Sequence, residues 1–153
     1  MIHPRTLVQR SLPVLLLATA SVGFSAWSSA RPAVAPANEA LEQAMGQLQQ
    51  SMKALGKGIS AETQAAALEE LAKIEAAILV AKTQTPDTAA TVDEKKRPDF
   101  VAEFRTTLLE ALKLVCDAEI AVVNEKYKEA EGILRGKLSS LKSASHDKFK
   151  GED

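Results

Sequence analysis

Two residues far apart in this chain of 153 residues could together hold a metal-containing cofactor. His146 is one of two histidines, the other being His3, and Met45 lies near the start of the first segment with helical periodicity. An imidazole and a thioether are one of the axial ligand pairs found on haem iron. The elements between these residues must therefore bring the start of the first segment beside the end of the last.

Helix-forming residues dominate the chain beyond Asn38, and no strand-like alternation of apolar and polar residues is present. The first predicted helix follows Asn38, a suitable N-cap, and ends at Gly56 and Gly58. Ser60 is expected to cap a second helix, which fades near Thr83. The inward positions are Leu41, Met45, Leu48, Met52 and Leu55 in the first helix and Leu68, Leu71, Ile74, Ile78 and Ala81 in the second.

A charged, proline-containing stretch over residues 84–97 separates the second helix from the third, and it is expected to form a long exposed crossover loop. Pro98 suits the first turn of the third helix. The chain turns again near Asn124, and a fourth helix is predicted from about Glu125 to Phe149. The inward positions are Phe100, Phe104, Leu108, Ala111, Leu112, Val115 and Val122, then Tyr127, Ala130, Leu134, Leu138 and Leu141.

Short connections after the first and third helices make those neighbours antiparallel, so the sequence predicts an all-α, up-down-up-down four-helix bundle over residues 38–150. One end of such a bundle collects the starts of helices one and three and the ends of helices two and four. The residues expected at that end are Met45, Ala81, Phe100, Phe104, His146 and Phe149. This end would offer a porphyrin both apolar, aromatic walls and two opposed ligands.

Residues 1–35 have the pattern of a secretory signal peptide. Arg5 and Arg10 precede an apolar run over residues 12–24, and small residues form possible cleavage sites between positions 30 and 37. A membrane anchor is the alternative, but the run is shorter than the roughly 20 residues needed to span a bilayer. We therefore expect export to the periplasm, with no stable membrane insertion after cleavage.

Removal of that segment takes away Arg5, Arg10 and Arg31 and no acid, so the formal charge changes from −1 to −4. An acidic domain whose lysines alternate with glutamates is unsuited to a phosphate backbone, which argues against nucleic acid as a partner. The remaining residues suffice for one domain, and we expect a monomer.

Cys116 is the only cysteine, so no disulfide can form within the chain. It lies in an apolar stretch and is expected to be a buried core thiol. The sequence has no C-x-x-C-H motif, so any haem would be held without covalent thioether links.

The two candidate ligands also have ordinary structural interpretations. Met45 follows the same periodicity as Leu41 and Leu48, as a core methionine would. His146 lies near a helix C-terminus, where a cation interacts favourably with the helix dipole. Periodicity and position alone therefore leave both interpretations open.

Two other classes of function remain as alternatives. One is a haem-free helical bundle that acts as a binding or chaperone-like module. The other is a catalytic metal site, which has little support because the sequence offers no E-x-x-H pair and no further histidine after the signal peptide. The acidic residues near the ligand end are interpreted as surface charges, namely Glu42, Glu103 and Asp147.

The segment Leu41–Leu48, LEQAMGQL, resembles the opening helix of the soluble cytochrome b562 family, in which the methionine at this place is an axial haem ligand. The last helix is similar to the family's at both ends, in Lys126–Ala130 and Ser145–Lys150. His146 stands where the family has its second ligand. The resemblance covers essentially the whole chain after the signal peptide.

Other positions resemble the family's site less uniformly. Phe100 and Phe104 reproduce the F-x-x-x-F pair that packs on the family's porphyrin, and Thr85-Pro86 matches the start of its crossover loop. Lys142 stands where family members can carry an arginine near the haem edge, and Phe149 replaces a tyrosine. The crossover loop and the third-helix region differ in length by a few residues.

The resemblance implies one haem b per chain, bound non-covalently, with Met45 and His146 as its axial ligands. Because both axial positions are then filled by the protein, the implied function is electron transfer to a redox partner protein rather than catalysis. The residues expected to contact the cofactor are Leu41, Leu48, Pro86, Phe100, Phe104, Lys142 and Phe149.

Overall fold

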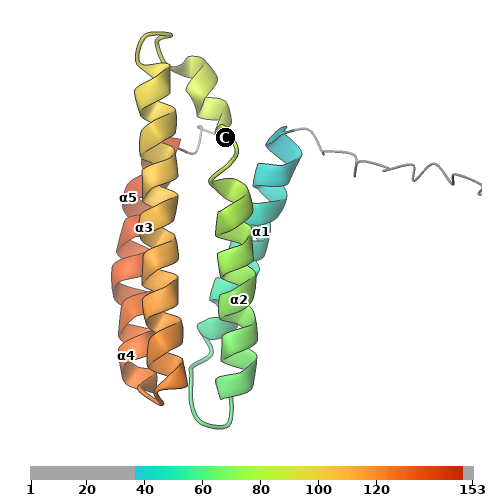
Figure 1. Cartoon of the computed structure of the whole chain (residues 1–153), viewed down its shortest axis with the longest axis vertical. Helices are drawn as coiled ribbons and strands as arrows, with labels where there is room; N and C mark the ends of the chain where they lie inside the picture. Colours follow the sequence, from blue (N-terminus) through green and yellow to red (C-terminus); the bar gives the residue numbers. More distant parts are fainter. Residues whose placement is uncertain (1–36, 150–153) are drawn as a thin grey trace, which may run out of the picture. The chain divides into compact units, whose positions relative to one another are not determined.

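The computed structural model describes residues 37–149, so the predicted signal peptide over residues 1–35 lies outside the described residues. Those residues form helices and turns with no strand among them, which confirms the prediction of an all-α chain. The first three long helices are α1 (Ala37–Leu55), α2 (Gln64–Ala81) and α3 (Arg97–Val123), shown in Figure 1. The fourth consists of α4 (Tyr127–Gly132), the π-helical segment η2 (Ile133–Leu138) and α5 (Ser139–Phe149), which follow one another without a break.

The start of α2 differs from its prediction. Thr63, not Ser60, is the residue that precedes the helix, and a turn occupies residues 61–63. The Ser60 N–H donates to Thr63 Oγ1 at 2.9 Å, while the Ser60 hydroxyl donates to Glu62 Oε2 at 2.6 Å. Ser60 therefore starts a turn instead of capping a helix, because its side chain bonds to a local carboxylate.

The crossover between α2 and α3 is more ordered than predicted. It contains a 3-10 helix, η1 (Asp87–Thr91), preceded by a buried Pro86 with extended backbone. Ala89 is 1% exposed, and its carbonyl accepts a hydrogen bond of 2.9 Å from Nε of Arg97. The prediction of an exposed loop is therefore correct for the charged residues 93–96 but wrong for this first part.

The fourth helix begins two residues later than predicted, because Glu125 adopts a left-handed backbone with φ of 60°. The Lys126 N–H donates to the carbonyl of Ala121 at 2.8 Å, which closes the turn after α3. The sequence predicted a single helix here and did not anticipate the π-helical segment.

The core is built mainly from apolar side chains of α2 and α3. Gln64 Nε2 at the start of α2 donates to the carbonyl of Val122 near the end of α3 at 3.0 Å, so the start of α2 lies beside the end of α3. Burial of each large aliphatic side chain contributes roughly 1.5–3 kcal/mol before entropy is subtracted. The largest fully buried apolar residues are Leu71, Ile74, Ile78, Val115 and Val122.

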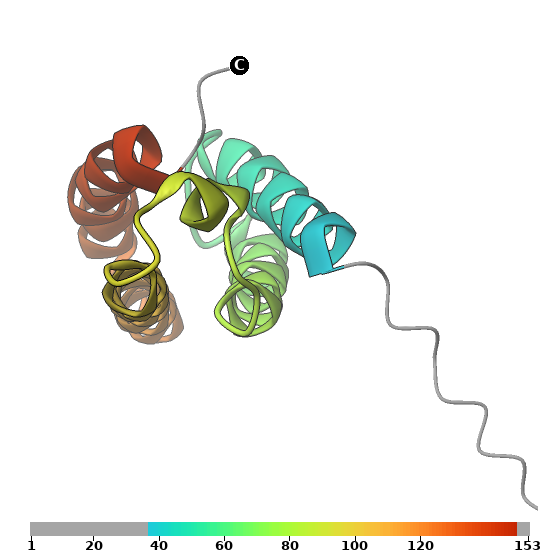
Figure 2. The same ribbon diagram turned by 90° about the horizontal axis from the view of Figure 1, so that it is seen from above.

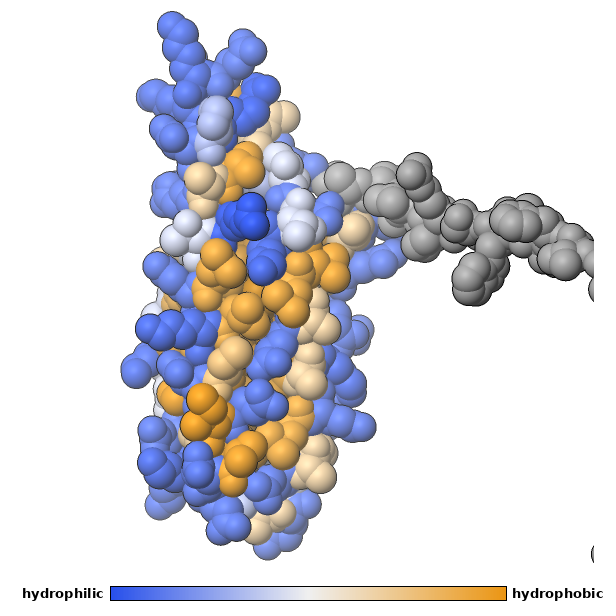
Figure 3. All heavy atoms as spheres, in the orientation of Figure 1, coloured by the Kyte–Doolittle hydropathy of each residue, from blue (hydrophilic) through white to orange (hydrophobic). Residues whose placement is uncertain are grey.

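The same two helices also carry exposed apolar side chains on their outer face. Figure 3 shows apolar residues gathered between polar ones on the face of the molecule where α2 and α3 lie toward the viewer. None of the described helices combines the length and the hydropathy that crossing a bilayer requires. The large exposed apolar residues of the two helices are Leu79, Val80, Leu109, Ile120 and Val123.

Packing around the bundle is uneven. α1 packs along α2, α2 along α3, and α3 along the fourth helix, whereas α1 and α5 make few contacts with each other. Seen along the helices in Figure 2, the first turns of α1 diverge from the end of α5. The α1–α5 seam, between the first and last helices, is therefore loosely packed.

Candidate cofactor site

A small cavity shows which sides of α1 and the fourth helix face each other. It has a volume of about 200 Å³ and lies between the end of α1 and the middle of the fourth helix. Met52 lines it from α1, and Ser139 lines it from the start of α5. The full lining consists of Met52, Leu55, Gly56, Glu131, Leu134, Arg135 and Ser139.

Met45 and His146 occupy the same two facing sides, further along the seam. Met45 precedes Met52 by seven residues, and His146 follows Ser139 by seven. Seven residues are about two turns of α-helix, so each residue keeps the face of its partner. Figure 1 shows the beginning of α1 and the end of α5 at the same end of the bundle, so both steps lead in the same direction.

The environments of the two residues differ. Met45 is half-buried and packs against the core, as do Leu41 and Leu48 of the same helix. His146 is exposed. Helical register directs both residues toward the α1–α5 seam, and the structure leaves His146 exposed instead of packing it into the core.

Three aromatic residues meet at this end, as the sequence predicted. The ring of Phe149 lies 5.2 Å from that of Phe100 and 5.2 Å from that of Phe104, both in edge-to-face geometry with interplanar angles of 61° and 69°. Such aromatic pairs stabilise a fold by more than their buried area alone would contribute. Phe104 is 4% exposed, so it anchors the cluster in the core.

The crossover closes over the same cluster. Thr88 Oγ1 donates to the carbonyl of Phe149 at 3.0 Å, which joins η1 to the last residue of α5. Pro86 is buried beside η1. The predicted contact residue Pro86 therefore belongs to the segment that covers this end, although the sequence did not predict the helical turn that holds it there.

The charged residues near this end are solvent-accessible. Lys142 is exposed, and so are Glu42 and Glu103, as predicted for surface charges. Lys148 forms an ion pair with Glu103, and its Nζ lies 5.9 Å from the centroid of the Phe149 ring. The side chain of Asp147, the third predicted surface charge, lies outside the described residues.

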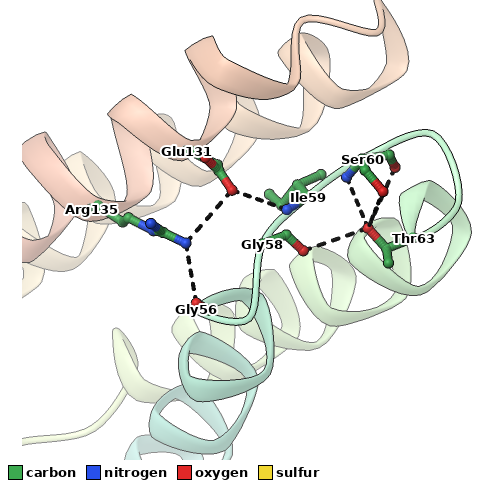
Figure 4. A network of polar contacts seen from close by, with 7 residues as sticks. All are labelled: Gly56, Gly58, Ile59, Ser60, Thr63, Glu131 and Arg135. Carbon is green, nitrogen blue, oxygen red and sulfur yellow. Dashed lines mark hydrogen bonds and ion pairs between the residues drawn. The ribbon is translucent and has the colours of Figure 1, made fainter.

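A clamp between the α1–α2 loop and the fourth helix was not predicted. Figure 4 shows Glu131 Oε1 accepting a hydrogen bond of 3.1 Å from the Ile59 N–H, and the Arg135 guanidinium donating to the Gly56 carbonyl at 3.1 Å. The two charged groups lie 3.6 Å apart. Their Glu-x-x-x-Arg spacing was the only signal in the sequence, and that spacing is common on exposed helix faces.

Cys116 is not the core thiol that the sequence predicted. It is half-buried at the α2–α3 interface, with Sγ 3.7 Å from Oε1 of Glu75. Burial raises the pKa of the Cys116 thiol, and the Glu75 carboxylate raises it further. Burial and then the charge of Glu75 also raise the pKa of Glu119.

Residues 37–149 contain no group of three or more histidine, cysteine or acidic side chains suited to hold a metal ion. The thioether and imidazole of the α1–α5 seam therefore remain the ligand pair of interest.

The fold and the seam together define a class: a helical bundle with a thioether and an imidazole on facing helices beside an aromatic cluster. Comparison with known families agrees with that class. A sequence model of the family described as cytochrome b562 matches residues 40–150, so the chain belongs to the cytochrome b562 family. A search of curated proteins found no match.

Proposed function

We propose that this protein is an electron carrier that binds one haem b non-covalently in the α1–α5 seam. Met45 and His146 are the axial ligands in this proposal. The observation that carries it is their register: each lies two turns from a residue of the cavity in which α1 and α5 face each other. Membership of the cytochrome b562 family supports the same cofactor.

The residues at this end fit a haem group. Thioether sulfur and imidazole nitrogen come from two different helices, so Met45 and His146 would hold the iron between α1 and α5. Leu41 and Leu48 flank Met45 on α1, and the phenylalanine cluster offers aromatic surface at the same end. The single cysteine, Cys116, cannot make the two thioether bonds of a covalently attached haem.

The roles of the residues follow from their chemistry. When bound, haem supplies a one-electron couple between ferric and ferrous iron. A neutral thioether from Met45 favours the ferrous state and raises the reduction potential. The apolar side chains of Leu48 and Phe104 act in the same direction, because they exclude water and disfavour additional positive charge. With both ligands supplied by the protein, no position is left for a substrate, so the proposal is a carrier and not an enzyme.

The proposal also includes the expected helix arrangement, export, oligomeric state and partner. The bundle has the antiparallel up-down-up-down arrangement, residues 1–35 direct export to the periplasm, and the exported domain acts as a monomer. Its partner is a redox protein, and neither nucleic acid nor a membrane is required.

Replacement of Met45 tests the ligand assignment directly. We expect Met45→Ala to convert the low-spin spectrum of the haem-loaded protein to a high-spin one and to lower the reduction potential, since one axial ligand is lost. Visible absorption and potentiometric titration measure both effects.

Met52→Ala is the matched control, because Met52 is the half-buried methionine two turns further along α1. It should leave the spectrum and potential unchanged. A Met45→Ala protein that resembles the wild type in both measurements would exclude Met45 as the ligand.

A further inference from the structure

The fourth helix carries one residue more than a regular α-helix would need. Its α-helical segments, α4 and α5, are joined by the π-helical segment Ile133–Leu138. A π-helical turn accommodates an additional residue, and such turns are frequent at functional sites. The residues on either side of the segment show how the additional residue changes the rotation of α5.

The apolar residues on the two sides of η2 share one face only because of that segment. Phe149 follows Ala130 by 19 residues, whereas about 18 residues complete five turns of α-helix. In a regular helix Phe149 would be turned about 100° from the face of Ala130, and Lys148 would take its place. The structure has the opposite arrangement: Ala130 is fully buried, Phe149 packs on Phe104, and Lys148 is exposed.

The same segment separates two parts of the helix that face α1. Before and within it, Glu131 and Arg135 hold the α1–α2 loop, which fixes the rotation of that part. After it, Ser139 lines the cavity opposite Met52, and His146 follows about two α-helical turns later. The rotation of α5, and with it the direction of His146, therefore depends on the extra residue in η2.

Glycine is not what makes the π-helical segment necessary. A Cβ atom at Gly136 would meet no atom within 4 Å, and Gly136 does not have positive φ. The requirement comes from the spacing of Ala130, Leu134 and Phe149. Gly136→Ala thus provides a control that changes the residue and keeps the length.

We propose that the π-helical segment Ile133–Leu138 is a positioning element, which absorbs one residue and so turns Phe149 toward the aromatic cluster and His146 toward α1. The part of this inference that concerns His146 rests on the haem ligation proposed above. The part that concerns Phe149 does not.

Deletion and insertion at the same position test the inference. Deletion of Gly136 should give a regular α-helix with the original rotation of α5, so the low-spin spectrum and the potential of the haem-loaded protein should not change. Insertion of one alanine after Gly136 should turn α5 by about 100° and lower the affinity for haemin by about tenfold or more. Gly136→Ala should resemble the wild type in both measurements.

A second readout needs no cofactor. Nuclear Overhauser contacts between the rings of Phe149 and Phe104, measured on the protein without haem, should persist after the deletion and disappear after the insertion. If the deletion removes these contacts, or if the insertion keeps them, the inference is wrong. A wild-type protein with these contacts but no low-spin haem spectrum would overturn the ligation proposal and leave the role toward Phe149 supported.

If a variant fails to fold, measurements on the wild type alone still test the proposed role of the π-helical segment. Backbone contacts in solution between residues i and i+5 within 133–138 support the inference. A regular α-helix there, with Phe149 still beside Phe104, would overturn it.

Discussion

At the scale of single residues, a side chain's neighbours decide whether it is reactive. Cys116 is half-buried beside Glu75, and both its burial and the adjacent carboxylate raise the pKa of the thiol. Since the thiolate is the nucleophile, only a small fraction of Cys116 is reactive at neutral pH. We therefore expect the Cys116 thiol to react slowly in the folded protein.

This gives a prediction for alkylation. At pH 8, iodoacetamide should modify Cys116 in the folded protein at least about tenfold more slowly than in the urea-unfolded protein. Glu75→Gln should accelerate the reaction of the folded protein, because it removes the nearest negative charge. Equal rates in the folded and unfolded wild type would contradict this assignment.

At the scale of helices, two like-charged groups meet where α2 and α3 pack. Glu119 is half-buried, and its pKa is raised by burial and then by the charge of Glu75. The charged group that acts on it from the packed helix α2 is Glu75, which also lies 3.7 Å from the Cys116 thiol. A raised carboxyl pKa means that the folded protein retains a proton which the unfolded chain releases.

The sign of the pH dependence follows from linkage. Between the unfolded pKa of Glu119 and its raised folded pKa, the folded state binds more protons, so the free energy of unfolding falls as the pH rises. Below that window both states are protonated and the penalty is absent. Above it the penalty is complete.

Glu119→Gln should therefore stabilise the protein at pH 7 by on the order of 0.5 kcal/mol, the scale of like-charged neighbours on helices. The gain should vanish near pH 4. Urea unfolding at the two pH values measures it, and Glu110→Gln is the matched control, because it removes the same formal charge from an exposed position of α3. A gain at pH 4 as large as that at pH 7 would refute the role of ionisation.

Apolar periodicity and turn residues predicted the existence and order of the four long helices, because these signals are local. The predicted start of α2 was wrong, since Ser60 has a choice of partners and bonds to Glu62 rather than to a helix terminus. The 3-10 helix η1 was missed because proline and charged residues are typical of loops. Within it the Ala89 carbonyl accepts a hydrogen bond from Arg97, eight residues away, a partner that local patterns do not indicate.

The π-helical segment had a signal that short-range periodicity hides. Spacings of three and four residues from Ala130 to Leu141 are compatible with an α-helix. Only the 19-residue separation in sequence between Ala130 and Phe149 reveals an extra residue. That inference requires knowing that both side chains face the core. Only the packed structure shows that Phe149 faces the core.

The candidate site was predictable to a similar extent. Topology brought Phe100, Phe104 and Phe149 together as expected. Helical register extends the facing sides of the cavity between α1 and the fourth helix to Met45 and His146, whose role as ligands stays a prediction. Sequence reasoning could not give the exposure of His146, which depends on the separation of α1 from α5.

At the scale of the whole molecule, the first and last helices make few contacts with each other. A ligand bound by one residue from each would join the first helix to the last at one end of the bundle. Because such a ligand binds only the folded chain, it would stabilise the protein by about 2.7 kcal/mol at a free concentration one hundred times its dissociation constant. The proposed cofactor would thus stabilise the contact between the first and last helices in addition to carrying the electron.

The central claim is that His146 and Met45 together hold haem in the α1–α5 seam. Its most direct test is the visible spectrum of the dithionite-reduced protein after titration with haemin, for the wild type, His146→Ala and the neighbouring control Ser145→Ala. We predict saturation at one haem per chain and sharp α and β bands in the wild type and the control, both lost in His146→Ala. A wild type that takes up no haemin, or a His146→Ala protein with the same bands, would contradict the claim.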